Sequence, residues 1–252
     1  MRTGLVSISF RGLSPNQIIA RAVRAGLDSI EWGGDVHVPP GDLKNAASVG
    51  ECTRAAGLSV ACYGSYYRLT AAEPGMARTV VRTAKALGAP LIRVWAGNLG
   101  SAEAGRAYRA TIYRNAQRIA DLAAQENIDI AFEYHGGTLT DDALSAKELL
   151  EAVDRKNVGT LWQPPVNMSV GDCIDSIRTV APWIRNIHVF SWNGTERLPL
   201  AEGGEKWRAY LDAIRQQPGG RSLMLEFVRG DDPDQLVRDA ETLKKWLKGD
   251  CQ

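Results

Sequence analysis

Two carboxylates and one imidazole belong to short apolar runs in the second half of the chain. Glu133 directly follows the run 128–132, and His188 and Glu226 lie in two later runs. An unpaired buried carboxylate is costly and would take up a proton, so a partner is expected. Carboxylates and an imidazole suit a divalent ion, with Mn2+ ahead of Mg2+ and Co2+. The alternative is that both carboxylates face solvent and His188 is a hydrogen-bonded core histidine.

Strand-like and helix-like segments alternate along the whole chain and must position these side chains. Gly26, Gly57 and Gly88 each follow a helical pattern and are spaced 31 residues apart. They are expected to end helices in the left-handed conformation, and Asn127 and Asn157 are expected to replace glycine later. The predicted strands are 5–10, 27–32, 58–63, 91–95, 128–133, 158–162, 184–190 and 223–227. The predicted helices are 15–25, 42–57, 74–88, 101–126, 145–153, 172–181, 205–217 and 234–248.

Eight strand-helix units joined by right-handed crossovers predict an α/β fold, a closed (β/α)8 TIM barrel forming one domain over residues 1–252. An open doubly wound sheet is disfavoured, because residues 10–14 lack the G-x-G-x-x-G pattern after the first strand. Active sites of such barrels lie at the carboxyl ends of the strands. The residues expected there are Glu31, Trp32, Arg93, Trp95, Glu133, His135, Gln163, His188 and Glu226.

The order of Glu133, His188 and Glu226 on strands five, seven and eight resembles the xylose isomerase-like TIM barrels. Residues 198–203, Leu-Pro-Leu-Ala-Glu-Gly, look like that family's L-P-x-G-E-G loop after strand seven. The resemblance implies four metal ligands, Glu133, Gln163, His188 and Glu226. Gln163 departs from the family pattern, which has Asp there, and a neutral amide should bind the ion less tightly than a third carboxylate.

The resemblance implies a divalent-metal-dependent isomerase or epimerase of a small sugar or polyol. Glu133 and Glu226 would be the catalytic residues, removing and returning a carbon-bound proton beside a polarised carbonyl through an enediolate. A lyase or dehydratase acting on an oxidised sugar or 3-oxo-glycoside would share this first step. A further alternative is a non-catalytic sugar-binding or partner-binding barrel whose metal site has decayed at Gln163.

Other polar and aromatic residues near the strand ends are candidates for substrate binding. His135 lies two residues beyond Glu133 and shares its face of the strand, although it could simply bond to the adjacent Gly-Gly turn. Arg93 could bind an anion or pair with an acid such as Glu31. The remaining candidates, for which space filling or solvent exposure is the alternative, are Trp95, Trp32, Trp162, His37 and Arg197.

The overall composition narrows the class of partner. Thirty basic and 29 acidic residues give a formal net charge of +1, which argues against nucleic acid as a partner. No apolar stretch has the length of a membrane span or signal sequence. Four scattered cysteines fit reduced thiols. We expect a cytoplasmic protein that binds a small sugar or polyol and, by the family resemblance, could form a homo-oligomer.

Overall fold

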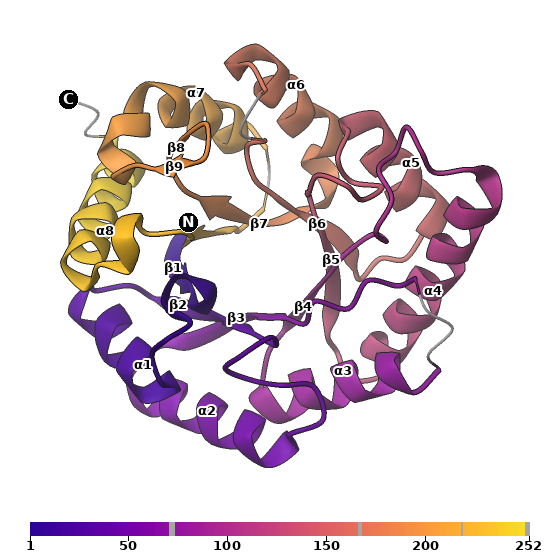
Figure 1. Ribbon diagram of the computed structural model, residues 1–252, viewed down its shortest axis with the longest axis horizontal. Coiled ribbons are helices and arrows are strands. Elements are labelled where there is room, and N and C mark those ends of the chain that lie inside the picture. Colours follow the sequence, from indigo (N-terminus) through magenta and orange to yellow (C-terminus); the bar gives the residue numbers. More distant parts are fainter. Residues whose placement is uncertain (71–73, 166–167, 218, 250–252) are drawn as a thin grey trace.

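The computed structural model describes residues 1–70, 74–165, 168–217 and 219–249. Eight parallel strands form a closed barrel in the order β1-β10-β7-β6-β5-β4-β3-β2, as the sequence predicted. Figure 1 shows the helices α1 to α8 arranged as a ring around this barrel. The barrel strands are β1 (Arg2–Val6), β2 (Ser29–Gly33), β3 (Ser59–Gly64), β4 (Leu91–Val94), β5 (Asp129–Glu133), β6 (Val158–Trp162), β7 (Ile184–Val189) and β10 (Ser222–Leu225).

The helices follow the strands in the alternation that parallel strands require. They are α1 (Pro15–Arg24), α2 (Leu43–Ala55), α3 (Pro74–Leu87), α4 (Arg106–Ala124), α5 (Ala143–Val153), α6 (Val170–Val180), α7 (Gly204–Arg215) and α8 (Pro233–Lys248). Short 3-10 helices η1 (Ser7–Phe10), η2 (Ala181–Trp183), η3 (Leu200–Gly203) and η4 (Arg229–Asp231) complete the connections. In the part of the chain that the structure describes, no helix is long and apolar enough to cross a membrane.

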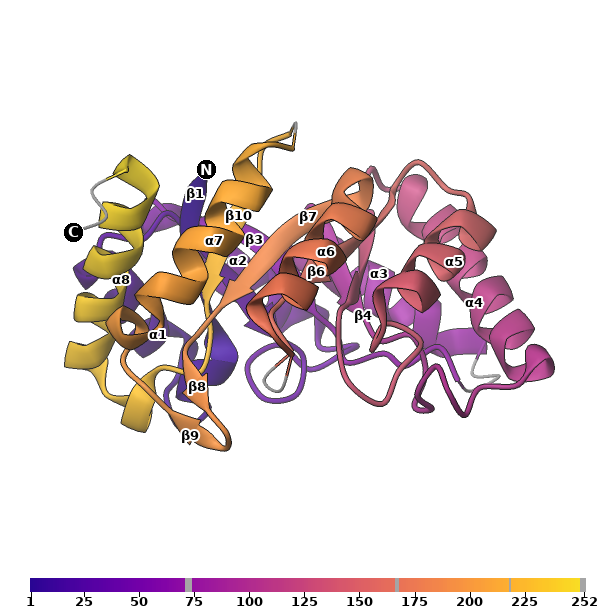
Figure 2. The same ribbon diagram turned by 90° about the horizontal axis from the view of Figure 1, so that it is seen from above.

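A small antiparallel hairpin, β8 (Trp192–Asn193) with β9 (Glu196–Arg197), follows β7 and was not predicted. It projects from the end of the barrel opposite the N-terminus (Figure 2). Gly194 lies in its turn with a φ of 57°. Asn193 pairs with Glu196, so the two loop residues are Gly194 and Thr195, and two-residue hairpin loops favour glycine at their first position. The sequence therefore contained a cue for this hairpin.

The helix ends confirm most of the expected capping positions. Gly26, Gly57 and Gly88 have φ values of 61°, 79° and 76°, and Asn127 has 56°, so all four adopt the left-handed conformation. The prediction for Asn157 was wrong. Its side chain instead donates hydrogen bonds to two backbone carbonyl oxygens, of Ala120 and Ile128, and ties α4 to the start of β5.

Two predicted boundaries were wrong for local reasons. The first strand was expected over 5–10 but ends at Val6, because Ser7 turns inward and its Oγ accepts a hydrogen bond from the Gly33 backbone. The helix expected over 101–126 begins at Arg106. The backbone N–H of Ser101 is held by the Asp141 carboxylate at 3.1 Å, which keeps this segment outside the helix.

Each barrel strand presents alternate side chains to the barrel interior and to the helices. Four interior side chains form a small apolar cluster separate from the main core: Cys62, Leu91, Ala131 and Leu161. Arg93 and Glu133 lie two residues farther along β4 and β5, so they share the interior face with this cluster. The apolar cluster is therefore the floor beneath the polar strand ends, and the larger core lies between strands and helices.

Candidate active site

A ring of buried charged and polar side chains closes the barrel at the carboxyl ends of its strands. Glu31, Arg93, Glu133, His188 and Glu226 are each no more than 3% exposed. Arg93, Glu133 and His188 end or nearly end strands β4, β5 and β7, Glu31 is the third residue of β2, and Glu226 directly follows β10. Burying five ionisable groups together is tolerable only if opposite charges are paired. The contacts among them satisfy that requirement.

Arg93 joins two carboxylates of this ring. Its Nη1 donates a short hydrogen bond to Oε2 of Glu133, and its Nε lies 3.0 Å from Oε1 of Glu31. Burial by itself would lower the pKa of Arg93, but the charges of Glu133 and Glu31 raise it well above its ordinary value. Arg93 was a candidate for binding a substrate anion. In the structure it instead pairs with two acidic side chains, which was the alternative prediction for Arg93.

His188 lies at the centre of the ring. Its Nε2 is 3.1 Å from Oε2 of Glu31, and its Nδ1 is 3.2 Å from Oε1 of Gln163 and 3.4 Å from Oε2 of Glu226. Burial alone would lower the pKa of His188, but Glu226 and Glu31 raise it to about 10. Likewise, burial would raise the pKa of Glu31, but His188 and Arg93 lower it. The Nε2–H group therefore donates to Glu31 and directs Nδ1 toward Gln163 and Glu226.

The predicted ligand residues meet at one point. Glu133, His188 and Glu226 each offer one ligand atom, and these atoms lie within 4.8 Å of one another. Donors about 2.1 Å from one ion are at most roughly 4 Å apart, so a small contraction would bring all three into contact with it. Gln163 reaches the same point, because its Nε2 lies 3.4 Å from Oε1 of Glu133.

Two features of the donors fit a divalent cation. The Oε2 atom of Glu226 is buried and has no hydrogen-bond partner among the described residues. The Nδ1 atom of His188 faces two oxygens, from Gln163 and Glu226, and an ion held by all three would take the place of the Nδ1 proton. Because Glu31 holds the other ring nitrogen, the imidazole is oriented as metal-binding histidines usually are.

His135 and Trp95 lie beside this cluster. The indole Nε1 of Trp95 donates to Oε2 of Glu133 at 2.6 Å, and the Trp95 ring stacks on the His135 ring with centroids 4.3 Å apart. The Nδ1 of His135 is 2.7 Å from the carbonyl oxygen of Gly136. A carbonyl oxygen can only accept, so Nδ1 donates this hydrogen bond, and in the neutral imidazole the lone pair is on Nε2. His135 is half-buried and lies outside the group Glu133, His188 and Glu226.

A pocket of about 660 Å³ opens above the cluster. Gln163 and His135 line it beside the cluster, and Phe190, Trp192 and Phe227 form an aromatic wall. These three rings meet edge to face, with centroid distances from 5.3 to 6.2 Å. A smaller pocket of about 190 Å³ adjoins it and shares Phe190 and Trp192. Pockets of this size and apolar character commonly hold small ligands.

Two predicted substrate-binding residues lie away from the cluster. Trp32 is fully buried and its indole N–H donates to Thr53 of α2, while Trp162 is fully buried and donates to Ser176 of α6. Each tryptophan directly neighbours an inward-facing residue of its strand, so the alternation of the strand turns it outward. These two side chains pack the layer between barrel and helices and do not line the pocket.

His37 and Arg197 are also engaged in structural contacts. His37 is 4% exposed, and its two ring nitrogens lie 3.0 Å from Oγ of Ser7 and 3.2 Å from the carbonyl oxygen of Leu13. Arg197 pairs with Asp231 at 2.7 Å. His37 therefore holds the loops after β1 and β2 together, and Arg197 fixes the β8–β9 hairpin to the loop after β10.

The site contains contacts and residues that the sequence interpretation did not include. Glu31 was expected at a strand end and as a possible partner of Arg93, but its contact with His188 was not predicted. The aromatic wall of Phe190, Trp192 and Phe227 was not predicted. Phe190 directly follows β7 and Phe227 lies two residues after β10, which was the available cue, but their meeting depends on how β7 and β10 pair.

Comparisons with known proteins agree with this architecture. A curated 3-dehydroshikimate dehydratase from Bacillus anthracis is 29% identical over 160 residues, which are 60% of this chain and 52% of the relative. The chain thus matches about half the length of that relative. The crystal structure of the probable 3-DHS dehydratase AsbF from Bacillus anthracis has a TM-score of 0.82, with 24% identity over 97% of this chain and 99% of that one.

The same fold is found in a D-psicose 3-epimerase crystallised in the presence of D-fructose. Its TM-score is 0.73, with 17% identity over 99% of this chain and all of the other. The family model described as "Xylose isomerase-like TIM barrel" matches residues 19–246, most of the chain. The barrel, its strand-end cluster and this match lead to one conclusion: the chain belongs to the xylose isomerase-like TIM barrel family.

Proposed function

We propose that this protein is a metal-dependent lyase that removes water from a small polyhydroxylated carbonyl compound. The observation that carries the proposal is the free Nε2 of His135, a base beside the Glu133–His188–Glu226 cluster that is not itself one of the metal-binding groups. The partial match to a dehydratase supports the same reaction class. On these two grounds we rank a lyase ahead of the isomerase or epimerase that the family resemblance first suggested.

Glu133, Gln163, His188 and Glu226 would hold the divalent ion. When bound, the ion would polarise a substrate carbonyl and stabilise the negative charge that develops on its oxygen. Oε2 of Glu133 already accepts hydrogen bonds from Arg93 and Trp95, so this oxygen is not free to take a substrate proton. Arg93 and Trp95 thereby fix the orientation of Glu133, and Oε1, which accepts only a long hydrogen bond of 3.4 Å from Gln163, would bind the ion.

His135 would perform the proton transfers. Its Nε2 takes the proton from the carbon next to the carbonyl, and the electrons of that C–H bond become part of a new C=C bond. The bond between the neighbouring carbon and its hydroxyl oxygen breaks, and the proton on Nε2 passes to the departing hydroxyl, which leaves as water. One histidine can serve both steps, because taking the proton prepares Nε2 to act as an acid and giving it up returns Nε2 to its basic form.

An isomerase or epimerase of a small sugar is the second candidate. Oε2 of Glu226 lacks a hydrogen-bond partner among the described residues, and Glu226 approaches the centre from a different strand than His135. Epimerisation needs a base and an acid on opposite sides of one carbon. Glu226 and His135 would supply them if the hydroxyl does not leave.

The test uses protein loaded with Mn2+ in D2O and a panel of ketoses, inososes, 3-oxo-glycosides and cyclic 3-hydroxy ketones. A lyase yields a product lighter by one water, with the absorbance of a conjugated carbonyl. An epimerase or isomerase yields a product of unchanged composition that carries deuterium. Removal of the metal with a chelator should abolish either reaction, and restored Mn2+ should recover it.

Two variants separate the roles of the residues. His135→Gln should lower the rate of water loss by about 100-fold or more. It should leave Mn2+ binding unchanged, because His135 is not one of the proposed metal ligands. Glu133→Gln should weaken both metal binding and turnover. If the purified protein binds no divalent ion and no substrate exchanges deuterium, the proposal fails and the non-catalytic binding barrel is favoured.

A further inference from the structure

The pocket above the metal-binding cluster is larger and less polar than a single small polyol requires. Besides the aromatic wall of Phe190, Trp192 and Phe227, it is lined by Pro164, Pro165 and Met168 of the loop after β6. Its volume, about 660 Å³, is in the range that holds a drug-sized ligand. The three aromatic rings brace one another edge to face, so the wall is preformed.

The charges around this pocket are unfavourable for an anion. None of the described residues that line it is a lysine or arginine, and its two carboxylates are Asp141 and Asp172. Arg197 lies over the rings of Trp192 and Phe227, but its charge is paired with Asp231. A phosphate or carboxylate in this pocket would therefore meet two carboxylates and no lysine or arginine among the described lining residues, while Lys206 of the adjoining smaller pocket is accompanied by Glu202.

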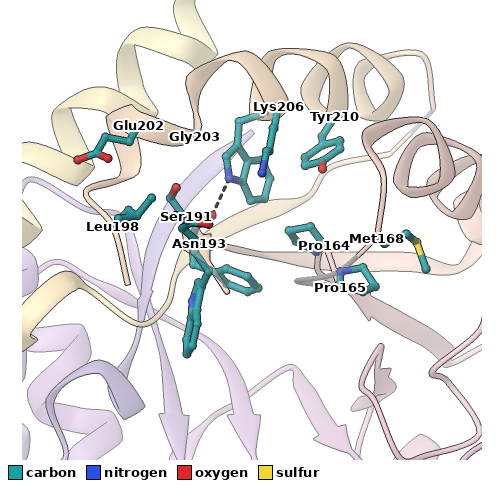
Figure 3. A pocket seen from close by; sticks show the side chains of 13 residues that line it. Pro164, Pro165, Met168, Ser191, Asn193, Leu198, Glu202, Gly203, Lys206 and Tyr210 are labelled. Atoms are coloured by element: carbon teal, nitrogen blue, oxygen red, sulfur yellow. Dashed lines mark hydrogen bonds between the residues drawn. The ribbon is translucent and has the colours of Figure 1, made fainter. Parts of the chain in front are cut away.

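One polar group of the wall is unsatisfied. The indole Nε1–H of Trp192 is buried and has no hydrogen-bond partner among the described residues. Trp192 lines both this pocket and the adjoining smaller one. In the smaller pocket, Lys206 and Tyr210 of α7 lie opposite Pro164, Pro165 and Met168 (Figure 3). Because Nε1 is buried, a ligand in these pockets meets the rest of the Trp192 ring, which favours contact with a flat apolar group.

Building on the proposed function, we propose that the substrate is an uncharged glycoside-like compound, with an oxidised sugar as the reacting part joined through oxygen to an aromatic group. The sugar lies at Gln163 and His135, and the aromatic group lies against Trp192, Phe227 and Met168. Burial of one aromatic ring against such a wall strengthens binding by about tenfold or more.

The alternative hypothesis is an anionic substrate bound by Arg68. This exposed side chain lies over the Trp95 ring with its guanidinium carbon 4.0 Å from the centroid, and it lines a different pocket together with Tyr66 and Tyr67 of the loop after β3. Arg68 would attract a phosphate or carboxylate at the rim of the site. The two readings predict opposite orders of affinity for neutral aromatic and anionic ligands.

Binding of three ligands that cannot enolise tests the inference independently of catalysis. Phenyl β-D-glucopyranoside, methyl β-D-glucopyranoside and glucose 6-phosphate are titrated calorimetrically into the full chain loaded with Mn2+ and, separately, into the metal-free chain. The expected result is that the phenyl glycoside binds about tenfold more tightly than the methyl glycoside, and that glucose 6-phosphate binds most weakly. The preference for the phenyl glycoside should persist without metal, since the aromatic wall is separate from the residues that would bind the metal.

Two tryptophan variants locate the effect. Trp192→Ala should abolish the preference for the phenyl glycoside, whereas Trp183→Ala should retain it, because Trp183 lies in η2 at the opposite end of the barrel. Equal affinity for both glycosides, tighter binding of glucose 6-phosphate, or binding of none of the three at their solubility limits would overturn the inference. These outcomes leave the lyase proposal standing, because that depends on metal-dependent loss of water from an oxidised substrate.

Discussion

The Nε2 atom of His188 lies 3.1 Å from Oε2 of Glu31, although the two residues are 157 positions apart in the chain. Both side chains are fully buried. Glu31 also pairs with Arg93, so one carboxylate orients the imidazole and balances the guanidinium. A carboxylate behind a metal-binding histidine commonly strengthens metal binding.

Replacement of Glu31 by Gln should therefore weaken Mn2+ binding by about 10- to 100-fold. The amide keeps the size of the side chain but removes the negative charge shared by His188 and Arg93. Calorimetric titration measures the affinity, and chemical denaturation checks that the variant is folded. Glu51→Gln, an exposed change on α2, is the matched control and should bind like the wild type. Unchanged affinity in Glu31→Gln would exclude the orienting role.

Replacement of Gln163 by Asp should tighten binding of Mn2+ by about tenfold. A third carboxylate adds charge to the ligand set at the position where Oε1 of Gln163 already lies 3.2 Å from Nδ1 of His188. The same calorimetric titration measures the change, with Gln163→Leu expected to bind more weakly than wild type. If neither substitution alters the affinity, Gln163 is not a ligand.

Metal binding should release about one proton per ion at neutral pH. Glu226 and Glu31 raise the pKa of His188 to about 10, so its imidazole is protonated below that pH and must lose the Nδ1 proton to bind metal. The apparent affinity should thus rise about tenfold per pH unit and level off near pH 10. Titrations in two buffers of different ionisation enthalpy count the protons. An affinity independent of pH between 7 and 9 would contradict the prediction.

Replacement of Gly64 by Ala should disturb the charged ring from the side of β3. A Cβ atom on Gly64 would lie 2.5 Å from Nη2 of Arg93 and 3.1 Å from Oε1 of Glu31. Because both side chains are held in ion pairs, they cannot move away freely, and the free energy of unfolding should fall by about 1–3 kcal/mol. Urea denaturation measures this change. Gly12→Ala has no atom within 4 Å of the added Cβ and should have little effect.

Trp95 and Trp162 should respond differently to replacement by Phe. Trp95→Phe removes the hydrogen bond that orients Glu133, so kcat of the metal-loaded enzyme should fall while stability changes little. Trp162→Phe removes the buried bond to Ser176 and should lower the free energy of unfolding by about 1–3 kcal/mol without changing KM. Steady-state kinetics and thermal denaturation separate the two. If Trp95→Phe lowers the stability but leaves kcat unchanged, Trp95 has no role in the reaction.

Much of the barrel was predictable from local patterns. Gly26, Gly57 and Gly88 ended helices at the expected residues, because left-handed backbone is easy only for glycine and a few other residues. Asn157 failed as a helix end because its amide found backbone acceptors in other elements. Strand parity could also have separated Trp95, which shares the parity of Arg93, from Trp32 and Trp162, which neighbour inward-facing residues.

The sequence by itself determined the repeating strand-helix order, and with it the convergence of Glu133, His188 and Glu226 at one end of a barrel, since parallel strands share a direction. Only the tertiary structure decided which groups touch. The Glu31–His188 contact and the aromatic wall depend on strand stagger and side-chain rotamers around the closed barrel. Such contacts join residues far apart in the chain, so no local spacing records them.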